Sequence, residues 1–306
     1  MDTQSLWRAS EWRVHTLLRR ARHTQHGRSV ETRDLQLTST AGYTLAARIT
    51  RRVGAGAQPG LVVSPGIHQG LAELHGYGSV VSAAELAGAG YTVLTFDPAG
   101  RGKSWGEEDF GGPEHQDNIR AALRALREDA GCNGQVGVLA LSLGIAAATA
   151  ALARWPELGA SFLLDWEGPC DREIITSGGT ILTPAAGHTL DDDGYWTPRE
   201  AVGHVARLPC PYVRLQALPD HAQPTEVRHA LRMAHAAERS RHDGTLPWFQ
   251  LNDHPRNEVP ARPTWVDGGP IAASRTILRK LRSLRALLEA APAVARAAER
   301  GGSGHG

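Results

Sequence analysis

Ser142 is the residue whose surroundings point most directly to chemistry. It follows the apolar run Val136–Leu141, which is typical of a buried strand, and precedes an alanine-rich run at 145–152 that is typical of a buried helix. Ala140 and Gly144 give the pattern A-x-S-x-G, whose small residues let the strand and helix backbones approach closely. Such a sharp turn holds a serine hydroxyl over the end of a sheet, beside free helix N–H groups. The pattern predicts a nucleophile, although a serine before a helix is also a common N-cap.

A nucleophilic serine needs a histidine to take its proton and a carboxylate to orient that histidine. Asp220 follows the predicted strand Tyr212–Ala217, and His254 follows the last predicted strand at 247–251. Because parallel strands end at one edge of a sheet, these side chains and Ser142 should meet there. The sequence therefore predicts Ser142, Asp220 and His254 as a catalytic triad, in that chain order.

Other residues could fill the roles of acid and base. Asp165 ends the preceding predicted strand and competes with Asp220 as the acid, and Glu167 is a third candidate. His221 competes as the base. We rank it below His254 because adjacent residues at a turn rarely direct their side chains at each other. The sequence leaves both choices open.

The order and spacing of these segments resemble the α/β-hydrolase superfamily, from about Asp34 to Leu288. Besides the serine turn, three stretches carry the resemblance: S-P-G-I-H at 64–68, D-P-A-G-R-G-K-S at 97–104, and Asp220 with Pro224. The first is similar to the oxyanion loop after the third strand of that fold, and the second to the D-x-x-G-x-G-x-S turn after its fourth strand. Chance agreement at one of these stretches is common, but their order together is specific.

The resemblance implies the donors of an oxyanion hole and a reaction class. The donors would be the backbone N–H of Leu143, directly after the nucleophile, and one from the Gly66–His68 turn, where we favour Ile67. The function implied is a serine hydrolase that cleaves a small carboxylic ester through an acyl-enzyme, without a cofactor or metal. A peptidase or acyltransferase with the same triad is the alternative enzyme. A catalytically silent, hydrolase-like binding protein is the alternative of another class.

Aromatic residues in the turns and in a predicted lid should wall an apolar pocket, which suits an acyl group of modest size. The expected pocket residues are His68, Trp105, Trp166 and Trp196. Each of them could equally be an ordinary packing or turn residue.

Strand and helix patterns alternate along the chain, which predicts an α/β fold: a mostly parallel, twisted sheet flanked by helices, with a small lid insertion. An antiparallel hairpin should form its leading edge. The expected strands lie at 34–40, 43–49, 61–63, 91–96, 136–141, 160–164, 212–217 and 247–251. The expected helices lie at 80–89, 117–129, 145–152, 225–240 and 271–288.

We predict three regions along the chain. Residues 1–30 form a helical extension, whose helix at 6–22 is expected to pack its tryptophans on the domain in preference to a membrane surface. Residues 31–290 form the hydrolase domain, with the lid inserted at about 167–208. Residues 291–306 form a tail with a disordered glycine-rich end.

Composition excludes several other functions. The net charge of +1 gives no electrostatic basis for binding nucleic acid. The chain has three scattered cysteines, too few for a zinc site or a disulfide framework, which are Cys132, Cys170 and Cys210. The polar start and the absence of a long apolar run predict a cytoplasmic protein without a signal peptide or membrane span. The sequence leaves open whether the chain forms a homo-oligomer.

Overall fold

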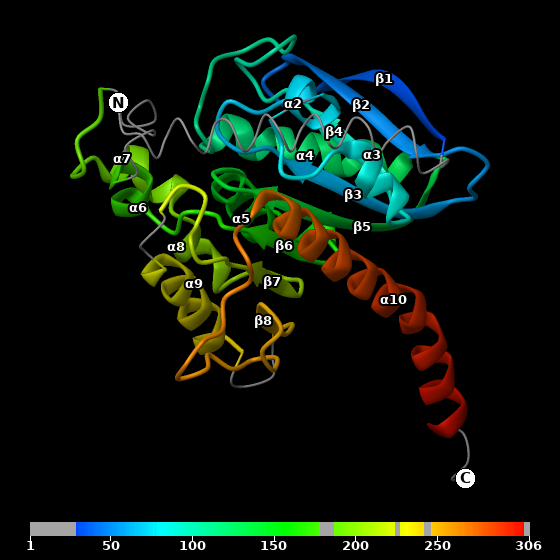
Figure 1. Cartoon of the computed structure of the whole chain (residues 1–306). Coiled ribbons are helices and arrows are strands. Elements are labelled where there is room, and N and C mark those ends of the chain that lie inside the picture. Colours follow the sequence, from blue (N-terminus) through cyan, green and yellow to red (C-terminus); the bar gives the residue numbers. More distant parts are fainter. Residues whose placement is uncertain (1–28, 77, 178–186, 224–226, 242–245, 303–306) are drawn as a thin grey trace.

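The central feature of the fold is one eight-stranded sheet, seen in the computed structural model of residues 29–76, 78–177, 187–223, 227–241 and 246–302 (Figure 1). Its strand order is β1-β2-β4-β3-β5-β6-β7-β8. The strands are β1 (Val30–Thr38), β2 (Thr44–Arg52), β3 (Gln58–Ser64), β4 (Thr92–Phe96), β5 (Cys132–Leu141), β6 (Leu163–Trp166), β7 (Tyr212–Leu215) and β8 (Phe249–Leu251). The sheet confirms the predicted fold class.

Strand direction divides the sheet into a hairpin edge and a parallel part. The first two strands pair antiparallel, and β2 also pairs antiparallel with β4. The pairs from β3 onward are parallel, through β5, β6 and β7 to β8. Every residue of β3 and β4 is buried, as expected for strands covered on both faces.

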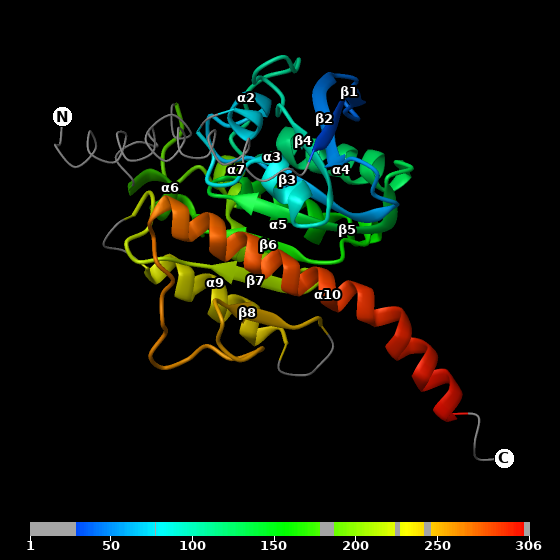
Figure 2. The same cartoon turned by 45° about the vertical axis from the view of Figure 1, so that its right-hand side comes forward.

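Helices cover both faces of the sheet (Figures 1 and 2). One core cluster joins the sheet to four helices: α4 (Pro113–Glu128), α5 (Gly144–Arg154), α8 (Ala201–Val205) and α9 (Arg228–Arg239). A second core cluster joins the other face to α2 (Leu71–His75), α3 (Ala83–Gly88) and α10 (Pro270–Gly302). Buried leucines at 123 and 126 in α4, and at 281 and 284 in α10, show how each amphipathic helix turns its apolar side to the sheet.

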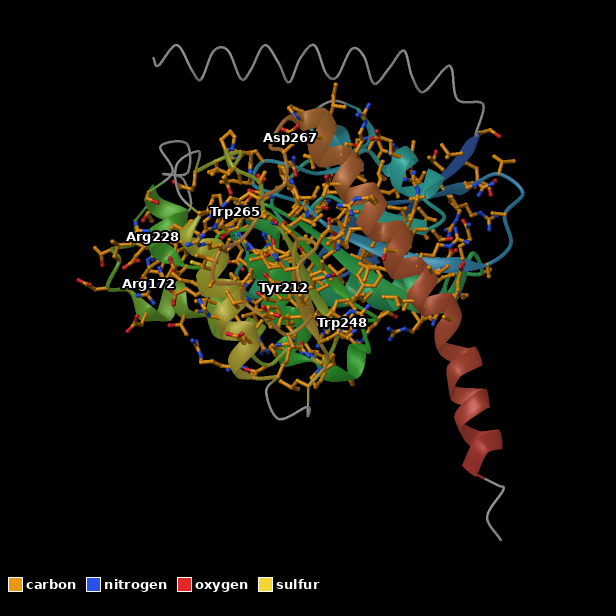
Figure 3. The ribbon with its side chains drawn as sticks, turned by 60° about the horizontal axis from the view of Figure 1, so that its bottom comes forward. Arg172, Tyr212, Arg228, Trp248, Trp265 and Asp267 are labelled. Atoms are coloured by element: carbon orange, nitrogen blue, oxygen red, sulfur yellow. The ribbon has the colours of Figure 1, made fainter. Side chains whose placement is uncertain are left out.

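The predicted lid segment follows β6 and carries α6 (Arg172–Ser177) and α7 (Asp193–Trp196) before α8. Figure 1 places these short helices together beyond one end of the strands. Arg172 holds the segment together, because its guanidinium donates to the Leu190 carbonyl at 2.7 Å and pairs with Asp193 and Glu200. It lies at the same end of the molecule as Arg228, where α9 begins (Figure 3).

The two ends of the chain differ from the expectation or lie outside the described residues. Helix α10 continues to Gly302, whereas the sequence predicted an end near Leu288. The predicted helix at 6–22 and the last four residues, 303–306, lie outside the described residues. Among the helices that the structure describes, none combines the length and the apolar character needed to cross a membrane.

Candidate active site

Ser142 occupies a strained turn between β5 and α5. Its φ of 51° lies in the left-handed region, which non-glycine residues adopt at a cost of about 1–3 kcal/mol. Gly144 leaves the room for this turn, since a Cβ there would lie 2.3 Å from the Ser64 carbonyl oxygen. Leu143 is the N-cap residue of α5 and no side chain caps the helix, so Ser142 does not serve as an N-cap. The turn has the backbone form expected for a nucleophile.

His221 is the histidine beside Ser142. Its Nε2 lies 2.9 Å from Ser142 Oγ, and its Nδ1 lies 2.7 Å from Glu167 Oε2. Glu167 is 2% exposed and directly follows β6, while His221 lies in the loop after β7. This serine–histidine–carboxylate chain can move the serine proton to His221 and stabilise the imidazolium that results.

Glu167 also fixes the loop that carries the histidine. Its Oε2 accepts the backbone N–H of His221 at 3.0 Å, and its Oε1 accepts that of Ala217 at 3.0 Å. Trp166 stacks on the His221 ring with centroids 4.5 Å apart and planes inclined by 27°. The ring is therefore held by an aromatic face as well as by the carboxylate, and its side chain keeps 22% exposure, which leaves it accessible.

The surroundings of His221 make it a stronger base than an ordinary histidine. Burial of the ring lowers its pKa, but the hydrogen bond to Glu167 and the charges of Glu167 and Asp220 raise it more, so the net pKa lies above the ordinary value. Protonation of Nε2 as the serine hydroxyl is deprotonated is thereby favoured.

Asp220, the predicted acid, lies close to His221, but Glu167 makes the shorter contact with the ring. Its Oδ1 is 3.5 Å from His221 Nδ1 and accepts the backbone N–H groups of Ala222 and Gln223 at 2.7 and 2.9 Å. Its Oδ2 accepts from Gln216 Nε2 at 2.7 Å. Burial raises the pKa of Asp220, but its contacts with histidines and N–H groups lower the pKa by more. The net pKa therefore lies below the ordinary value, and the carboxylate is ionised. It shapes the loop and adds a second negative charge near His221.

Asp165, the competing acid, belongs to a buried network below the site. Its Oδ2 accepts from the Tyr212 hydroxyl at 2.7 Å and pairs with Arg214 at 2.6 Å, and Figure 3 places Tyr212 among the central strands. The side chains of Asp165 and Arg214 are 0% and 1% exposed. Arg214 also donates to Gln216, which in turn holds Asp220. These contacts make Asp165 a structural partner of Arg214.

The structure does not bring His254 to Ser142, so the predicted base has to be corrected. The backbone N–H of Thr264 donates to His254 Nε2 at 2.9 Å, which fixes this ring on the loop after β8. Glu167 occupies the place predicted for Asp220, and His221 the place predicted for His254. The chain turns back directly after β8, where Asn252 has φ of 50° and the His254 N–H bonds to the Leu251 carbonyl at 3.0 Å.

The predicted oxyanion donors lie against the turn at Ser142 between β5 and α5, which we call the elbow. Ile67 packs against a cluster that contains Leu143. A Cβ on Gly66 would lie 3.3 Å from Ser142 Cβ, which places the Gly66–Ile67 turn directly on the nucleophile. Among the hydrogen bonds of the described residues, none engages the backbone N–H of Ile67 or Leu143. Both donors are therefore available for a negatively charged oxygen.

The four predicted pocket residues have different surroundings. Trp166 contacts the site through its stacking on His221. Trp196 is fully buried beside Leu143, and its indole N–H donates to the Thr189 carbonyl at 2.8 Å, which makes it a packing residue of the predicted lid segment. Trp105 is 74% exposed, and His68 is an exposed turn residue with φ of 55°.

The acidic groups beside His221 also invite comparison with a metal site. Ligand atoms of Glu167, Asp220 and His221 lie within 4.8 Å of one another. However, all four carboxylate oxygens already accept N–H donors, from Ala217, His221, Gln216, Ala222 and Gln223. A cation would have to displace these bonds, so the cluster fits an orienting role for the carboxylates better than a ligand set.

The family of the chain follows from a match to a family model. The model described as X-Pro dipeptidyl-peptidase (S15 family) matches residues 7–187, more than half of the chain. The chain belongs to this family. The matched part of this S15 protein contains Ile67, Ser142 and Glu167 and ends before His221. The protein is thus a serine hydrolase of the α/β-hydrolase type.

Solved structures with the same fold include esterases and peptidases. An esterase of Pyrococcus furiosus shares 15% identity at a TM-score of 0.57, covering 85% of this chain and 92% of the esterase. Brefeldin A esterase, a bacterial homologue of human hormone-sensitive lipase, shares 18% identity at a TM-score of 0.59, and the match covers 84% of this chain and 76% of the esterase. The acylaminoacyl peptidase of Pyrococcus horikoshii shares 14% identity at a TM-score of 0.61, and the match covers 88% of this chain and 43% of the peptidase.

The matched peptidases are much longer than this chain. This chain spans less than half of the length of the matched acylaminoacyl peptidase and 38% of a matched prolyl endopeptidase. No curated protein matches the sequence significantly. The solved structures therefore establish the fold, and the substrate has to be argued from the site.

Proposed function

We propose that the protein hydrolyses a small carboxylic ester through a triad of Ser142, His221 and Glu167. The observation that carries the proposal is the continuous chain of contacts, 2.9 Å from Ser142 to His221 and 2.7 Å from His221 to Glu167. It joins a serine in a strained turn to a histidine whose pKa is raised. These are the conditions under which a serine becomes a nucleophile.

In this mechanism Ser142 Oγ attacks the ester carbonyl carbon while its proton passes to His221 Nε2. Glu167 stabilises the imidazolium, and the N–H groups of Leu143 and Ile67 stabilise the oxyanion. The intermediate collapses when His221 gives the proton to the leaving alkoxide, which departs as an alcohol and leaves an acyl-enzyme. Water then attacks the acyl-enzyme with His221 again acting as base, which releases the acid and restores the serine.

An ester is our first choice of substrate because the surroundings of the elbow are apolar. Ile67, Phe110 and Leu143 pack with residues of the lid, Ile175 from α6 and Tyr195 from α7. We propose that the partly buried members of this cluster, Ile67, Phe110 and Tyr195, face the substrate, because an acyl chain of modest size suits apolar surroundings. The likeness to the Pyrococcus furiosus esterase, which covers 92% of that enzyme, supports the same choice.

The match to the X-Pro dipeptidyl-peptidase family favours a second candidate, cleavage of an amide bond after proline. The same triad would perform it, with the leaving amine in place of the alcohol. A direct comparison of p-nitrophenyl butyrate with alanyl-proline p-nitroanilide separates the two candidates. We expect a serine-dependent burst with the ester. The kcat/KM for the anilide should be at least about a hundredfold lower, because a site without specific contacts to the proline and the amine of that substrate discriminates against it by such a factor.

Ser142→Ala is the matched control for both substrates and should reduce kcat by about 10⁶-fold. A preference for the anilide would favour the peptidase. No serine-dependent turnover of either substrate, together with no reaction of Ser142 with a fluorophosphonate, would indicate a hydrolase-like binding protein.

We also propose that the protein works in the cytoplasm, a reducing compartment. The three cysteines are free and buried. Free cysteines are typical of proteins kept under reducing conditions, which agrees with the cytoplasmic location proposed from the sequence.

A further inference from the structure

The turn that carries the proposed oxyanion donor Ile67 is held by a residue from another turn of the chain. Arg101 lies in the 97–104 turn, and its Nη1 donates to the Gly66 carbonyl oxygen at 2.7 Å and to that of Gln69 at 3.3 Å. The Gln69 side chain accepts the Gly66 N–H at 2.9 Å. Both polar backbone groups of Gly66 are therefore bound before a substrate arrives.

Arg101 is itself rigidly placed. Its guanidinium binds Glu108 through two nitrogens, with Nη2 at 2.8 Å from Oε1, and its side chain is 10% exposed. Burial raises the pKa of Glu108, but the bond to Arg101 and nearby charges lower it more, so the pair is ionised. Such bidentate pairs fix the plane of the guanidinium.

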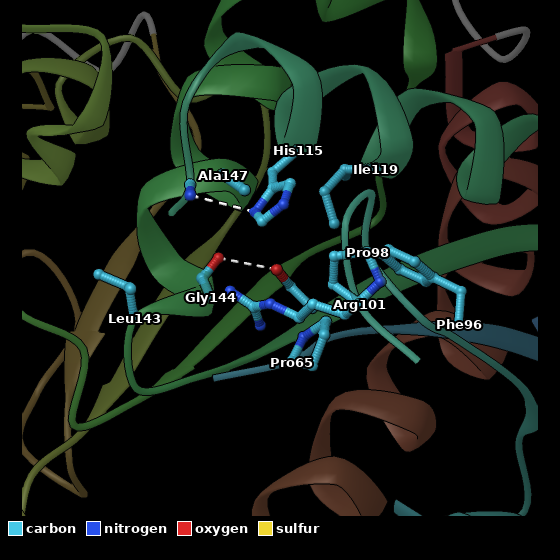
Figure 4. Close-up of a pocket in the computed structure, with 11 residues that line it drawn as sticks. Pro65, Phe96, Pro98, Arg101, His115, Ile119, Leu143, Gly144 and Ala147 are labelled. Carbon is cyan, nitrogen blue, oxygen red and sulfur yellow. Dashed lines mark hydrogen bonds between the residues drawn. The ribbon is translucent and has the colours of Figure 1, made fainter. Parts of the chain in front are cut away.

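Arg101 lines a small cavity next to the start of α5. Arg101 lines it together with Pro65, Leu143 and Gly144, and its side chain reaches across the cavity beside Pro65 and Gly144 (Figure 4). The cavity has room for about one water molecule. Arg101 thus shares this cavity with Leu143, one of the two predicted oxyanion donors, and with Pro65 of the turn that carries the other.

The geometry of the peptide group connects Arg101 to catalysis. In a planar trans peptide the carbonyl and the N–H point in opposite directions. When Arg101 draws the Gly66 carbonyl toward itself, the N–H of Ile67 in the same peptide must point the other way. A Cβ on Gly66 would meet Leu141 O at 3.1 Å and Ser142 Cβ at 3.3 Å, so this peptide lies directly on the elbow.

We infer that Arg101 is a positioning residue of the oxyanion hole, which keeps the Ile67 N–H aimed at the oxygen that becomes negative when Ser142 attacks. The inference rests on the proposed function and deepens it. Preorganised donors stabilise a transition state because they need no reorientation during the reaction. Without Arg101, the Gly66 carbonyl would keep only the longer bond from the Gln69 N–H, at 3.2 Å. The peptide could then rotate more freely, and part of this stabilisation would be lost.

The test compares Arg101→Met with the wild-type enzyme on p-nitrophenyl butyrate and on an alkyl trifluoromethyl ketone, which forms an oxyanion adduct with a serine. We expect kcat to fall by about 10²–10³-fold, the effect of losing one oxyanion donor, and ketone affinity to fall in parallel. KM should change less than about threefold, because the ground-state ester makes little use of the hole. A merely structural arginine would not produce this split.

Arg101→Lys is the second variant, in case the methionine variant does not fold. It keeps the charge but lacks the planar guanidinium that binds Glu108 through two nitrogens while a third donates to Gly66, so kcat should fall by about tenfold. Arg241→Met is the matched control: Arg241 is also buried and donates to a backbone carbonyl, that of Ala237, at 2.9 Å. Its loss should lower thermal stability but leave kcat and ketone affinity unchanged.

Wild-type kcat and ketone affinity in a folded Arg101→Met enzyme, or in Arg101→Lys where the first does not fold, would overturn the inference. Equal losses in the Arg241→Met control would do the same. A wild-type protein that neither hydrolyses the ester nor binds the ketone would instead overturn the proposed function, so the two failures are distinguishable.

Discussion

The loops after β6 and β7 and the loop after β8 carry the same residue types but lie in different surroundings. The first two loops supply Glu167 and His221, whose side chains are 1% and 22% exposed and bind across neighbouring strands. The last loop supplies Asp253 and His254. Asp253 is 53% exposed and binds Arg279 and Lys280 of α10.

Strand order explains which loop reaches the serine. The order β5-β6-β7-β8 makes β6 the neighbour of the strand that leads to Ser142, with β8 two strands beyond it at the sheet edge. At about 4.8 Å between strands, the loop after β8 must reach back about 14 Å. The loop after β7 has a shorter distance to reach, and Glu167 fixes it there by binding the backbone and the ring of His221. In this chain the loop after β7, and not the loop after β8, brings its histidine to Ser142.

Removal of the Glu167 charge should have the largest effect on this comparison. Glu167→Gln keeps the size of the side chain but no longer stabilises the imidazolium, so kcat should fall by about 10³–10⁴-fold. Asp253→Asn, the same change of a carboxylate in the β8 loop, should leave kcat unchanged. Steady-state hydrolysis of p-nitrophenyl butyrate measures both. A nearly normal Glu167→Gln enzyme beside an inactive Asp220→Asn enzyme would reassign the acid to Asp220.

The buried ion pair below the site should matter next, through stability. Arg214→Met leaves Asp165 buried without its cation, which should lower the free energy of unfolding by about 3–5 kcal/mol. Arg279→Met breaks the exposed pair with Asp253 and should lower it by at most about 1 kcal/mol. Urea denaturation of both variants measures the difference. An equal loss of unfolding free energy in both variants would show that the buried pair below the site is no more important for stability than the exposed pair in the β8 loop.

The pH dependence should show a smaller effect of the same carboxylate. His221 acts as base only when neutral, so kcat/KM should fall as the pH drops through its pKa, which lies above the ordinary value because of Glu167. In Glu167→Gln this cause is gone, and the acidic limb of the pH–rate profile should move to lower pH. The profile of Asp253→Asn should coincide with that of the wild type. A limb that stays in place in Glu167→Gln would contradict the pairing.

Some of this could be predicted from the sequence, because it depends on local patterns. The parallel strands follow from apolar runs, the leading hairpin from alternating residues, and the turn at Ser142 from the small residues Ala140 and Gly144. The partners of Ser142 depend on which side chains of separate loops converge, and several acids and histidines follow strands. Because Asp220 precedes His221, the sequence ranks this histidine below His254, but its closest carboxylate, Glu167, lies after the neighbouring strand β6. A histidine after β7 and a glutamate after the neighbouring β6 were the only signals for this pair.

The most direct test of the central claim is the rate at which a fluorophosphonate labels Ser142 in His221→Ala and in His254→Ala, with the labelled peptide identified by mass spectrometry. The account predicts a rate reduced by at least about 10³-fold in His221→Ala, because the serine loses its base. It predicts a wild-type rate in His254→Ala. Normal labelling in His221→Ala with a lost reaction in His254→Ala would contradict the account and restore the loop after β8 as the source of the base.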